Sequence, residues 1–180
     1  MLEITVPATE LWDEEKEEFI TTEEQTLKLE HSLVSLSKWE SKWCKPFLGK
    51  EPKTLEETLS YIKCMTINKN VDPDVYNCIT PDIRNQINEY IDAPMTATTF
   101  KERQGSTINR EQITSELIYY WMITLGIPVE FQKWHLNKLI TLIRVCNLKN
   151  QPAKKRSSQQ LVSDYAALNA ARRKKLNTKG

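Results

Sequence analysis

The sequence predicts a mainly α-helical protein with a small N-terminal β-sheet of two or three strands. Only four glycines stand against eight prolines in 180 residues, which disfavours an all-β sandwich or barrel with its many glycine-dependent turns. Apolar residues recur at helical spacing from residue 33 to residue 146, whereas apolar–polar alternation is confined to the first 31 residues. We therefore expect one helical core domain over residues 32–148, preceded by strands and an acidic segment at 1–31 and followed by a basic segment at 149–180.

The first 31 residues carry the strand signals. Residues 2–6 and 26–31 alternate apolar and polar side chains, and residues 19–21 offer a third short strand between them. The same segment is acidic, with nine acids between Glu10 and Glu30 against only Lys16 and Lys28. A small sheet with a solvated acidic run follows from this pattern.

Three helices are predicted between residues 32 and 92. Ser32 is an N-cap for a helix that ends before Pro46, and Thr54 with Glu57 forms a capping box for a second helix to about residue 65. After a loop at 68–74, Thr80 and Pro81 give the cap and first-turn signals of a third helix that runs to about residue 91.

Two longer helices are predicted after a connection at 93–106. The first begins at Thr107 or Asn109, ends at Gly126, and has an apolar face of Ile113, Leu117, Tyr120, Trp121 and Leu125. The second runs from about Phe131 to Cys146 and is apolar on nearly all sides, so we expect it at the centre of the core. The short link at Gly126 and Pro128 predicts a long antiparallel helix hairpin around which the domain is built.

A basic C-terminal helix is predicted after the linker at 150–158, with Ser157 or Ser158 as its cap. Its apolar stripe consists of Leu161, Tyr165 and Leu168, and its end carries four consecutive cations, Arg172, Arg173, Lys174 and Lys175. The ends of the chain therefore carry opposite charge. Two interpretations stand: solvated tails, or electrostatic docking between copies or with a partner.

The sequence offers few groups for catalysis. It has no phosphate-binding glycine loop, nucleophile elbow or zinc-protease motif, and we interpret His31 and His135 as hydrogen-bonded structural residues. The four cysteines lack close pairs, so they are interpreted as small buried apolar residues rather than as zinc ligands. The prediction is a protein that is not an enzyme and holds neither metal nor cofactor.

Aromatic residues are the candidate binding residues. Trp39 and Trp43 lie one above the other at helical spacing, next to Leu36, and Tyr120, Trp121 and Trp134 add further large side chains. Two interpretations are open, a buried core and a docking face for another protein, since tryptophan is frequent at interface hot spots. A helical interior of this size does not readily hide all of them, so we predict that these six residues bind a partner.

Five segments of the chain resemble proteins from the tail-morphogenesis region of long-tailed bacteriophages. They are residues 31–43 (HSLVSLSKWESKW), 90–98 (YIDAPMTAT), 119–122 (YYWM), 132–137 (QKWHLN) and 168–173 (LNAARR). The resemblance spans nearly the whole chain and is to tail assembly chaperones.

This resemblance implies a set of partners. Tail assembly chaperones are thought to coat the long, apolar, helical tape measure protein until tail tube subunits polymerise around it. It implies a protein of the host cytoplasm that leaves before the virion matures, with a frameshifted longer form that recruits tube subunits and with self-association as a further expectation. Arg173, Lys174 and Lys175 are compatible with an adenine-rich slippery site.

Two alternatives remain open. One is a head–tail joining or tail-terminating protein that stays in the virion. The other is a DNA-associated protein that acts through its basic C-terminal helix, although that helix lacks the stacking aromatics and the surrounding fold of most nucleic-acid binders. No stretch of the sequence has the apolar length of a membrane span, and the N-terminus lacks the pattern of a secretory signal, so we expect a cytoplasmic protein.

Overall fold

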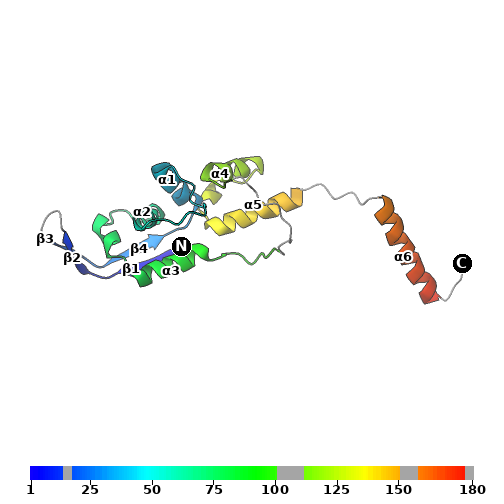
Figure 1. Cartoon of the computed structure of the whole chain (residues 1–180), viewed down its shortest axis with the longest axis horizontal. Helices are drawn as coiled ribbons and strands as arrows, with labels where there is room; N and C mark the ends of the chain where they lie inside the picture. Colours follow the sequence, from blue (N-terminus) through cyan, green and yellow to red (C-terminus); the bar gives the residue numbers. More distant parts are fainter. Residues whose placement is uncertain (14–17, 101–111, 151–157, 177–180) are drawn as a thin grey trace. The chain divides into compact units, whose positions relative to one another are not determined.

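The computed structural model describes residues 1–13, 18–100, 112–150 and 158–176 (Figure 1). It divides into two compact units, Met1–Leu148 and Lys149–Gly180. The first unit joins an N-terminal pair of antiparallel strands to a set of helices, so the predicted class, mainly helical with a small N-terminal sheet, is confirmed. The predicted strand region 1–31 and helical region 32–148 thus belong to one unit.

Four short strands make two consecutive two-stranded antiparallel sheets, together called here the N-terminal ribbon. β1 (Leu2–Val6) pairs with β4 (Gln25–Leu29), and β2 (Thr9–Asp13) pairs with β3 (Glu18–Thr22). Both pairs share one register. Leu2 lies opposite Leu29 and Thr9 lies opposite Thr22, so the same number of residues separates the two pairs on each side of the ribbon. Strand β2 was not predicted, because its sequence lies inside the acidic segment and lacks a clear apolar alternation.

The ribbon buries one face against the helices. Ile4, Val6, Leu27 and Leu29 are buried, and the alternating residues between them are exposed. This is the period-2 arrangement expected for a sheet with one solvated face. The residues that follow α2 extend the sheet edge, because Ile67 N–H donates to the carbonyl of Lys28 and Glu30 N–H donates to the carbonyl of Met65.

Three helices begin at the caps that the sequence predicts. α1 (Leu33–Trp43) is capped by Ser32 and α2 (Leu55–Met65) by Thr54, each in a reciprocal capping box. α3 (Pro81–Asp92) has Thr80 as its cap and proline in its first turn. Between α2 and α3, the residues Pro73–Cys78 form the 3₁₀ helix η1, part of which was predicted as loop.

Helix α4 (Ser115–Thr124) begins later than predicted. Thr107 and Asn109 lie outside the described residues, and the observed cap is Thr114, whose hydroxyl accepts the N–H of Leu117. The predicted apolar face is only partly correct: Ile113, Trp121 and Leu125 are partly buried against the core, but Tyr120 is exposed, and the buried residues of the helix include Ile118 and Met122. The sequence is apolar on every side of this helix, so its pattern does not select the buried face.

The predicted second long helix is divided in the structure. Phe131 lies in the 3₁₀ helix η2 (Val129–Lys133), Trp134 follows it, and α5 (Leu136–Asn150) buries only one face, with Leu136, Leu139 and Ile143. A long α4–α5 hairpin is not confirmed, since α4 packs mainly against α1. α5 is instead anchored at its start, where Leu136 N–H donates to the carbonyl of His31.

The core lies where the ribbon, α1, α2 and the first turns of α5 meet. Leu27, Leu29, Leu33, Leu36 and Ile62 are among its fully buried side chains. Burial of large aliphatic side chains of this kind stabilises the folded chain by about 1.5–3 kcal/mol each. Among the described helices, none is long and apolar enough to cross a membrane.

The second unit contains α6 (Ser158–Leu176), which appears in orange and red in Figure 1. Tyr165 and Leu168 of the predicted stripe are exposed within it, and the side chain of Leu161 lies outside the described set. Arg173, Lys174 and Lys175 occupy the last turn, where the helix dipole favours cations.

The prediction that all four cysteines are buried is wrong. Cys78 is buried, Cys64 and Cys146 are half-buried, and Cys44 is exposed. Cys44 ends α1 in the left-handed conformation at φ 50°, which places it at the surface.

Candidate functional site

Helix α4 of the first unit leaves two large apolar side chains exposed to solvent. Ile123 is 80% exposed and Tyr120 is 59% exposed. Both lie opposite the buried residues Ile118 and Met122 on the helix. A helix that is apolar all round is normally enclosed on all sides, so the outer face of α4 is unusual for a solvated helix.

The chain around α4 carries no charge over thirteen residues. From Leu117 to Val129 the sequence contains no Lys, Arg, Asp, Glu or His. Val129, at the end of this run, is 58% exposed. The exposed apolar side chains along this uncharged segment make it a candidate binding surface for another protein.

The 3₁₀ helix η2 and the residue after it contribute two further aromatic rings, Phe131 and Trp134. The hydroxyl of Tyr119 donates to Oε1 of Gln132 over 2.9 Å, which connects α4 to η2. Phe131 and Trp134 stack with ring centroids 4.0 Å apart, and Lys138 Nζ lies 4.3 Å from the centroid of the Trp134 ring. Burial raises the pKa of Tyr119, so its hydroxyl stays protonated and remains a donor.

We define the α4–η2 surface as the exposed Tyr120, Ile123 and Val129 together with the half-buried Trp121, Phe131 and Trp134. Of the six predicted binding residues, Tyr120, Trp121 and Trp134 belong to this surface. Ile123, Val129 and Phe131 were not predicted as binding residues. The uncharged run from Leu117 to Val129 is a sequence signal that could have identified Ile123 and Val129, whereas Phe131 lies beyond it.

The other three predicted binding residues lie elsewhere. Leu36 and Trp39 are 0% and 1% exposed, and the indole N–H of Trp39 donates to the carbonyl of Glu57. Both side chains belong to the core and are inaccessible to a partner in this structure. Trp43 is half-buried against Trp39, with centroids 6.2 Å apart, and its indole N–H donates to the hydroxyl of Ser60. The two rings are neighbours on α1 as predicted, but they are tilted at 30° to each other, and their indole N–H groups join α1 to α2 instead of facing a partner.

The position of α4 depends on a buried carboxylate. Glu40, in α1, accepts the backbone N–H of Phe47 with Oε1 over 2.8 Å and that of Ser115 with Oε2 over 2.7 Å. Ser115 is the first residue of α4, where free N–H groups and the helix dipole favour an anion. One side chain thus fixes both the loop after α1 and the start of α4. This role of Glu40 was not predicted from the sequence.

Both histidines lie in a buried polar cluster away from the α4–η2 surface. His31 Nδ1 and the hydroxyl of Tyr61 are 2.6 Å apart, and His135 Nε2 lies 3.0 Å from the carbonyl oxygen of Tyr90. Burial, with the neighbouring His135, lowers the pKa of His31 to about 3, and burial lowers the pKa of His135 as well. Both are hydrogen-bonded, as predicted, and the lowered pKa values keep both neutral at physiological pH.

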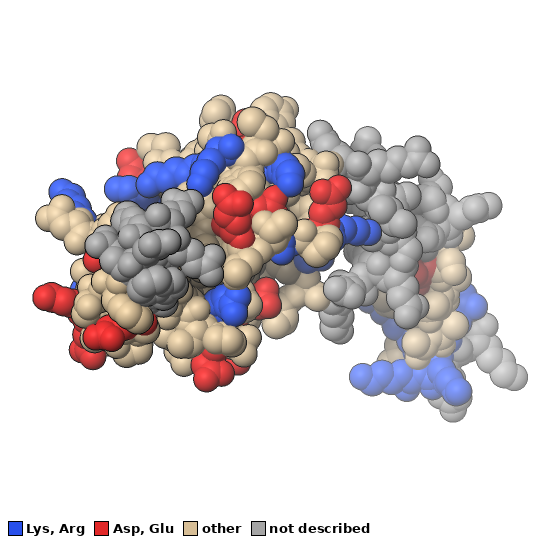
Figure 2. All heavy atoms as spheres, turned by 60° about the vertical axis from the view of Figure 1, so that its left-hand side comes forward, with Lys and Arg blue, Asp and Glu red and all other residues tan. Residues whose placement is uncertain are grey.

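Charge on the folded unit is mixed rather than gathered into one field. Figure 2 shows acidic and basic side chains interspersed over the visible face of the first unit. Separately, Arg172, Arg173, Lys174 and Lys175 on α6 are all exposed. The four cations that were predicted from the sequence are therefore exposed within the second unit.

Among the described residues, no group of three or more His, Cys, Asp or Glu side chains is placed to hold a metal ion. The chain matches no protein-family model, no curated protein and no solved structure. The geometry of the α4–η2 surface is consequently the basis for a functional assignment.

Proposed function

We propose that this protein is a phage tail assembly chaperone that binds apolar helices of the tape measure protein through the α4–η2 surface. The observation that supports binding through this surface is the outer face of α4, which leaves Tyr120 and Ile123 largely exposed within an uncharged run of thirteen residues. The resemblance of the chain to tail-morphogenesis proteins supplies the partner. On this proposal the protein acts in the host cytoplasm, releases its client to tail tube subunits, and is absent from the mature virion.

The physical basis is mutual coverage of apolar surface. A long helical client that has not yet been enclosed by the tail tube presents repeated apolar faces to water. A helix with exposed aliphatic and aromatic side chains covers such a face in the helix-packing manner, with large residues entering the partner's grooves. Charged residues spread over the rest of the first unit keep such a complex in solution.

Co-expression with the tape measure protein tests the proposal. The fraction of tape measure protein in the soluble lysate should rise several-fold when this chain is present. An unchanged soluble fraction would remove the chaperone function. Mass spectrometry of purified virions tests the alternative of a joining or terminating protein, because a chaperone is absent from them whereas such a protein is present in ring-like copy number.

The Ile123→Glu variant tests the surface itself. Because Ile123 is 80% exposed, the change should leave the thermal unfolding temperature almost unaltered while the introduced charge blocks client binding. Leu55→Glu is the matched control, since Leu55 is 57% exposed in the first turn of α2, away from the uncharged run. If both variants solubilise the client equally well, the binding surface lies elsewhere even though the function stands.

A further inference from the structure

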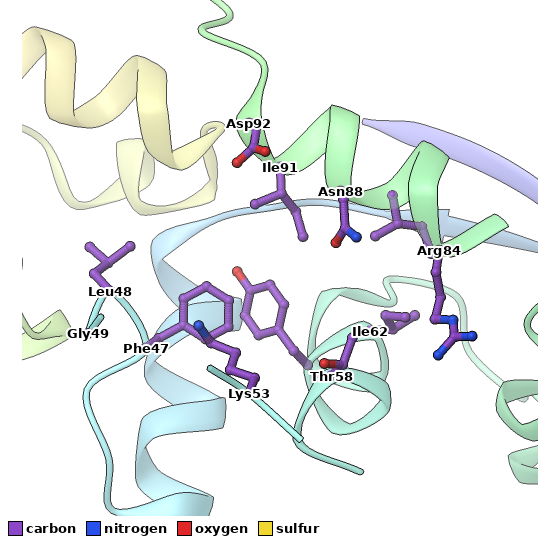
Figure 3. A pocket seen from close by; sticks show the side chains of 12 residues that line it. Phe47, Leu48, Gly49, Lys53, Thr58, Ile62, Arg84, Asn88, Ile91 and Asp92 are labelled. Atoms are coloured by element: carbon purple, nitrogen blue, oxygen red, sulfur yellow. The ribbon is translucent and has the colours of Figure 1, made fainter. Parts of the chain in front are cut away.

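A pocket in the first unit opens between α2, α3 and the loop after α1, apart from the α4–η2 surface. Its volume is about 360 Å³, which falls within the usual range for small-ligand pockets. α3 contributes one continuous face to it, with Arg84, Ile87, Asn88 and Ile91 at helical spacing. Figure 3 shows Arg84, Asn88 and Ile91 on the opposite side of the opening from Phe47, Leu48 and Lys53.

The inner wall of the pocket is apolar and aromatic. Phe47 and Tyr61 stack with ring centroids 3.9 Å apart, and Ile62, Ile87 and Ile91 complete the wall. Tyr61 is held by its hydrogen bond to His31, so the wall is fixed from behind by the buried cluster. A flat apolar body fits such a surface.

The charged side chains of the lining have no ionic partner. Lys53 and Arg84 line the pocket from different elements, and Asp92 lies at the far end of α3 from Arg84 (Figure 3). Among the described residues, the ion pairs include Met1–Glu30, Lys28–Glu3 and Lys45–Glu57, and none of the three side chains takes part in one. The lining therefore carries two cations and one acid, a net charge of +1.

Lys53 is the more constrained of the two cations. Its ammonium group lies 4.2 Å from the centroid of the Phe47 ring and is half-buried. Burial lowers its pKa, against the opposing effect of Glu57. Glu57 does not neutralise it directly, because its carboxylate is bound by Lys45 and by the backbone N–H of Thr54. An anion brought next to Lys53 would offset this loss of solvation.

We propose that this pocket binds a monoanionic carboxylate attached to an apolar or aromatic body. The body lies against Phe47 and Tyr61, the carboxylate lies beside the ammonium group of Lys53, and Arg84 adds positive charge from α3 on the other side of the pocket (Figure 3). The net charge of +1 matches one carboxylate, and Asp92 opposes a ligand of higher negative charge. Two sources offer this chemistry: a free aromatic acid, and an acidic side chain beside an aromatic residue in a peptide.

Titration of the full-length protein with 3-phenylpropionate, followed by amide chemical shifts in NMR, tests the site. We expect binding with Kd of about 1 mM, typical of a ligand of this size, with the largest shifts at Thr58, Asn88 and their neighbours. The neutral analogue 3-phenylpropanamide should bind about tenfold more weakly, because it lacks the charge that Lys53 and Arg84 attract. Equal binding of the amide, equal binding of inorganic phosphate, or no shift at the pocket residues would overturn the proposal.

Substitutions at the pocket give effects of opposite sign. Lys53→Gln and Arg84→Gln should each weaken binding about three- to tenfold, and Asp92→Asn should strengthen it about two- to threefold. Lys50→Gln is the matched control, since Lys50 is exposed in the same loop and does not line the pocket. If Lys50→Gln and Lys53→Gln weakened binding equally, the ligand would respond only to the net charge of the protein, and the proposed site would be wrong.

A blocked pentapeptide with adjacent Glu and Phe distinguishes the two sources. Tighter binding of the peptide than of 3-phenylpropionate supports the site and assigns it to a partner segment. Tighter binding of the free acid supports the site and assigns it to a small molecule. Because Ile123→Glu leaves the pocket intact, it should not alter either affinity, so failure of the chaperone function and failure of this site are separable.

Discussion

The Glu40 carboxylate is the interaction on which the placement of α4 most depends, and Glu40→Gln is the perturbation that tests it. Glu40 is 7% exposed and accepts two backbone N–H groups, from Phe47 and from Ser115. A glutamine has the same shape, but one of its two terminal atoms is an NH₂ donor. That group would then face one of the two N–H donors at about 2.7–2.8 Å.

The expected loss of stability follows from the hydrogen bonds that the two backbone N–H donors lose. A hydrogen bond to a charged group contributes about 1.5–3 kcal/mol, and a buried donor left unsatisfied costs about 1–3 kcal/mol. With one bond weakened by loss of charge and the other lost, we expect Glu40→Gln to lower the free energy of unfolding by about 2–4 kcal/mol. For a protein of this size that corresponds to a fall in Tm of about 5–15 °C.

Thermal unfolding by circular dichroism measures the total effect, and amide hydrogen exchange locates it. Protection should fall first at Ser115 and Phe47 and through the first turn of α4. Glu89→Gln is the control, since Glu89 is exposed on α3 and should change the free energy by less than about 0.5 kcal/mol. If Glu40→Gln and Glu89→Gln unfold at the same temperature, the carboxylate does not hold α4 and the reasoning is refuted.

Three further outcomes follow from the structure. Because the pKa of His31 is lowered to about 3 in the folded chain, the unfolded chain binds more protons between about pH 6.5 and pH 3. The stability that His31 contributes is therefore complete above pH 6.5 and falls on acidification by up to about 1.4 kcal/mol per pH unit. Urea titrations at pH 7, 5.5 and 4 should show that the free energy of unfolding changes less with pH in His31→Gln than in the unmodified protein. The same pH dependence in both proteins would contradict this. Trp39→Ala should lower the free energy of unfolding by about 3–5 kcal/mol, whereas Trp43→Ala should cost about half as much, since only Trp39 is fully buried; equal losses in urea titration would contradict the burial argument. A chain that ends after Leu148 should unfold within about 2 °C of the full-length protein in calorimetry, because the two units are separate, and a larger fall would show that they depend on each other.

Elements with local signals could be predicted from the sequence. The caps Ser32, Thr54 and Thr80 each accept a backbone N–H from within their own first turn, so a few neighbouring residues are sufficient to specify these helix starts. The alternation at Leu2–Val6 likewise reports which side chains face the core. In such cases the stabilising interaction and the sequence pattern involve the same residues.

The candidate site could be predicted only in part. Tyr120, Trp121 and Trp134 were identified because aromatic residues are common in interfaces, but the same argument selected Leu36 and Trp39, which are buried. Residue type does not distinguish a core aromatic from a surface aromatic. That distinction depends on which other elements pack over the side chain.

The sequence by itself determined the helical class, the strands β1, β3 and β4 and the first three helix starts, because each leaves a local pattern of caps or apolar alternation in the sequence. Only the tertiary structure decided which face of α4 is buried, where α4 begins and how Phe131 and Trp134 are placed. Those features depend on the bond between Glu40 and Ser115 and on the contact between Tyr119 and Gln132. A helix that is apolar on every side has no intrinsic orientation, so its exposed face is set by the elements that happen to pack against it.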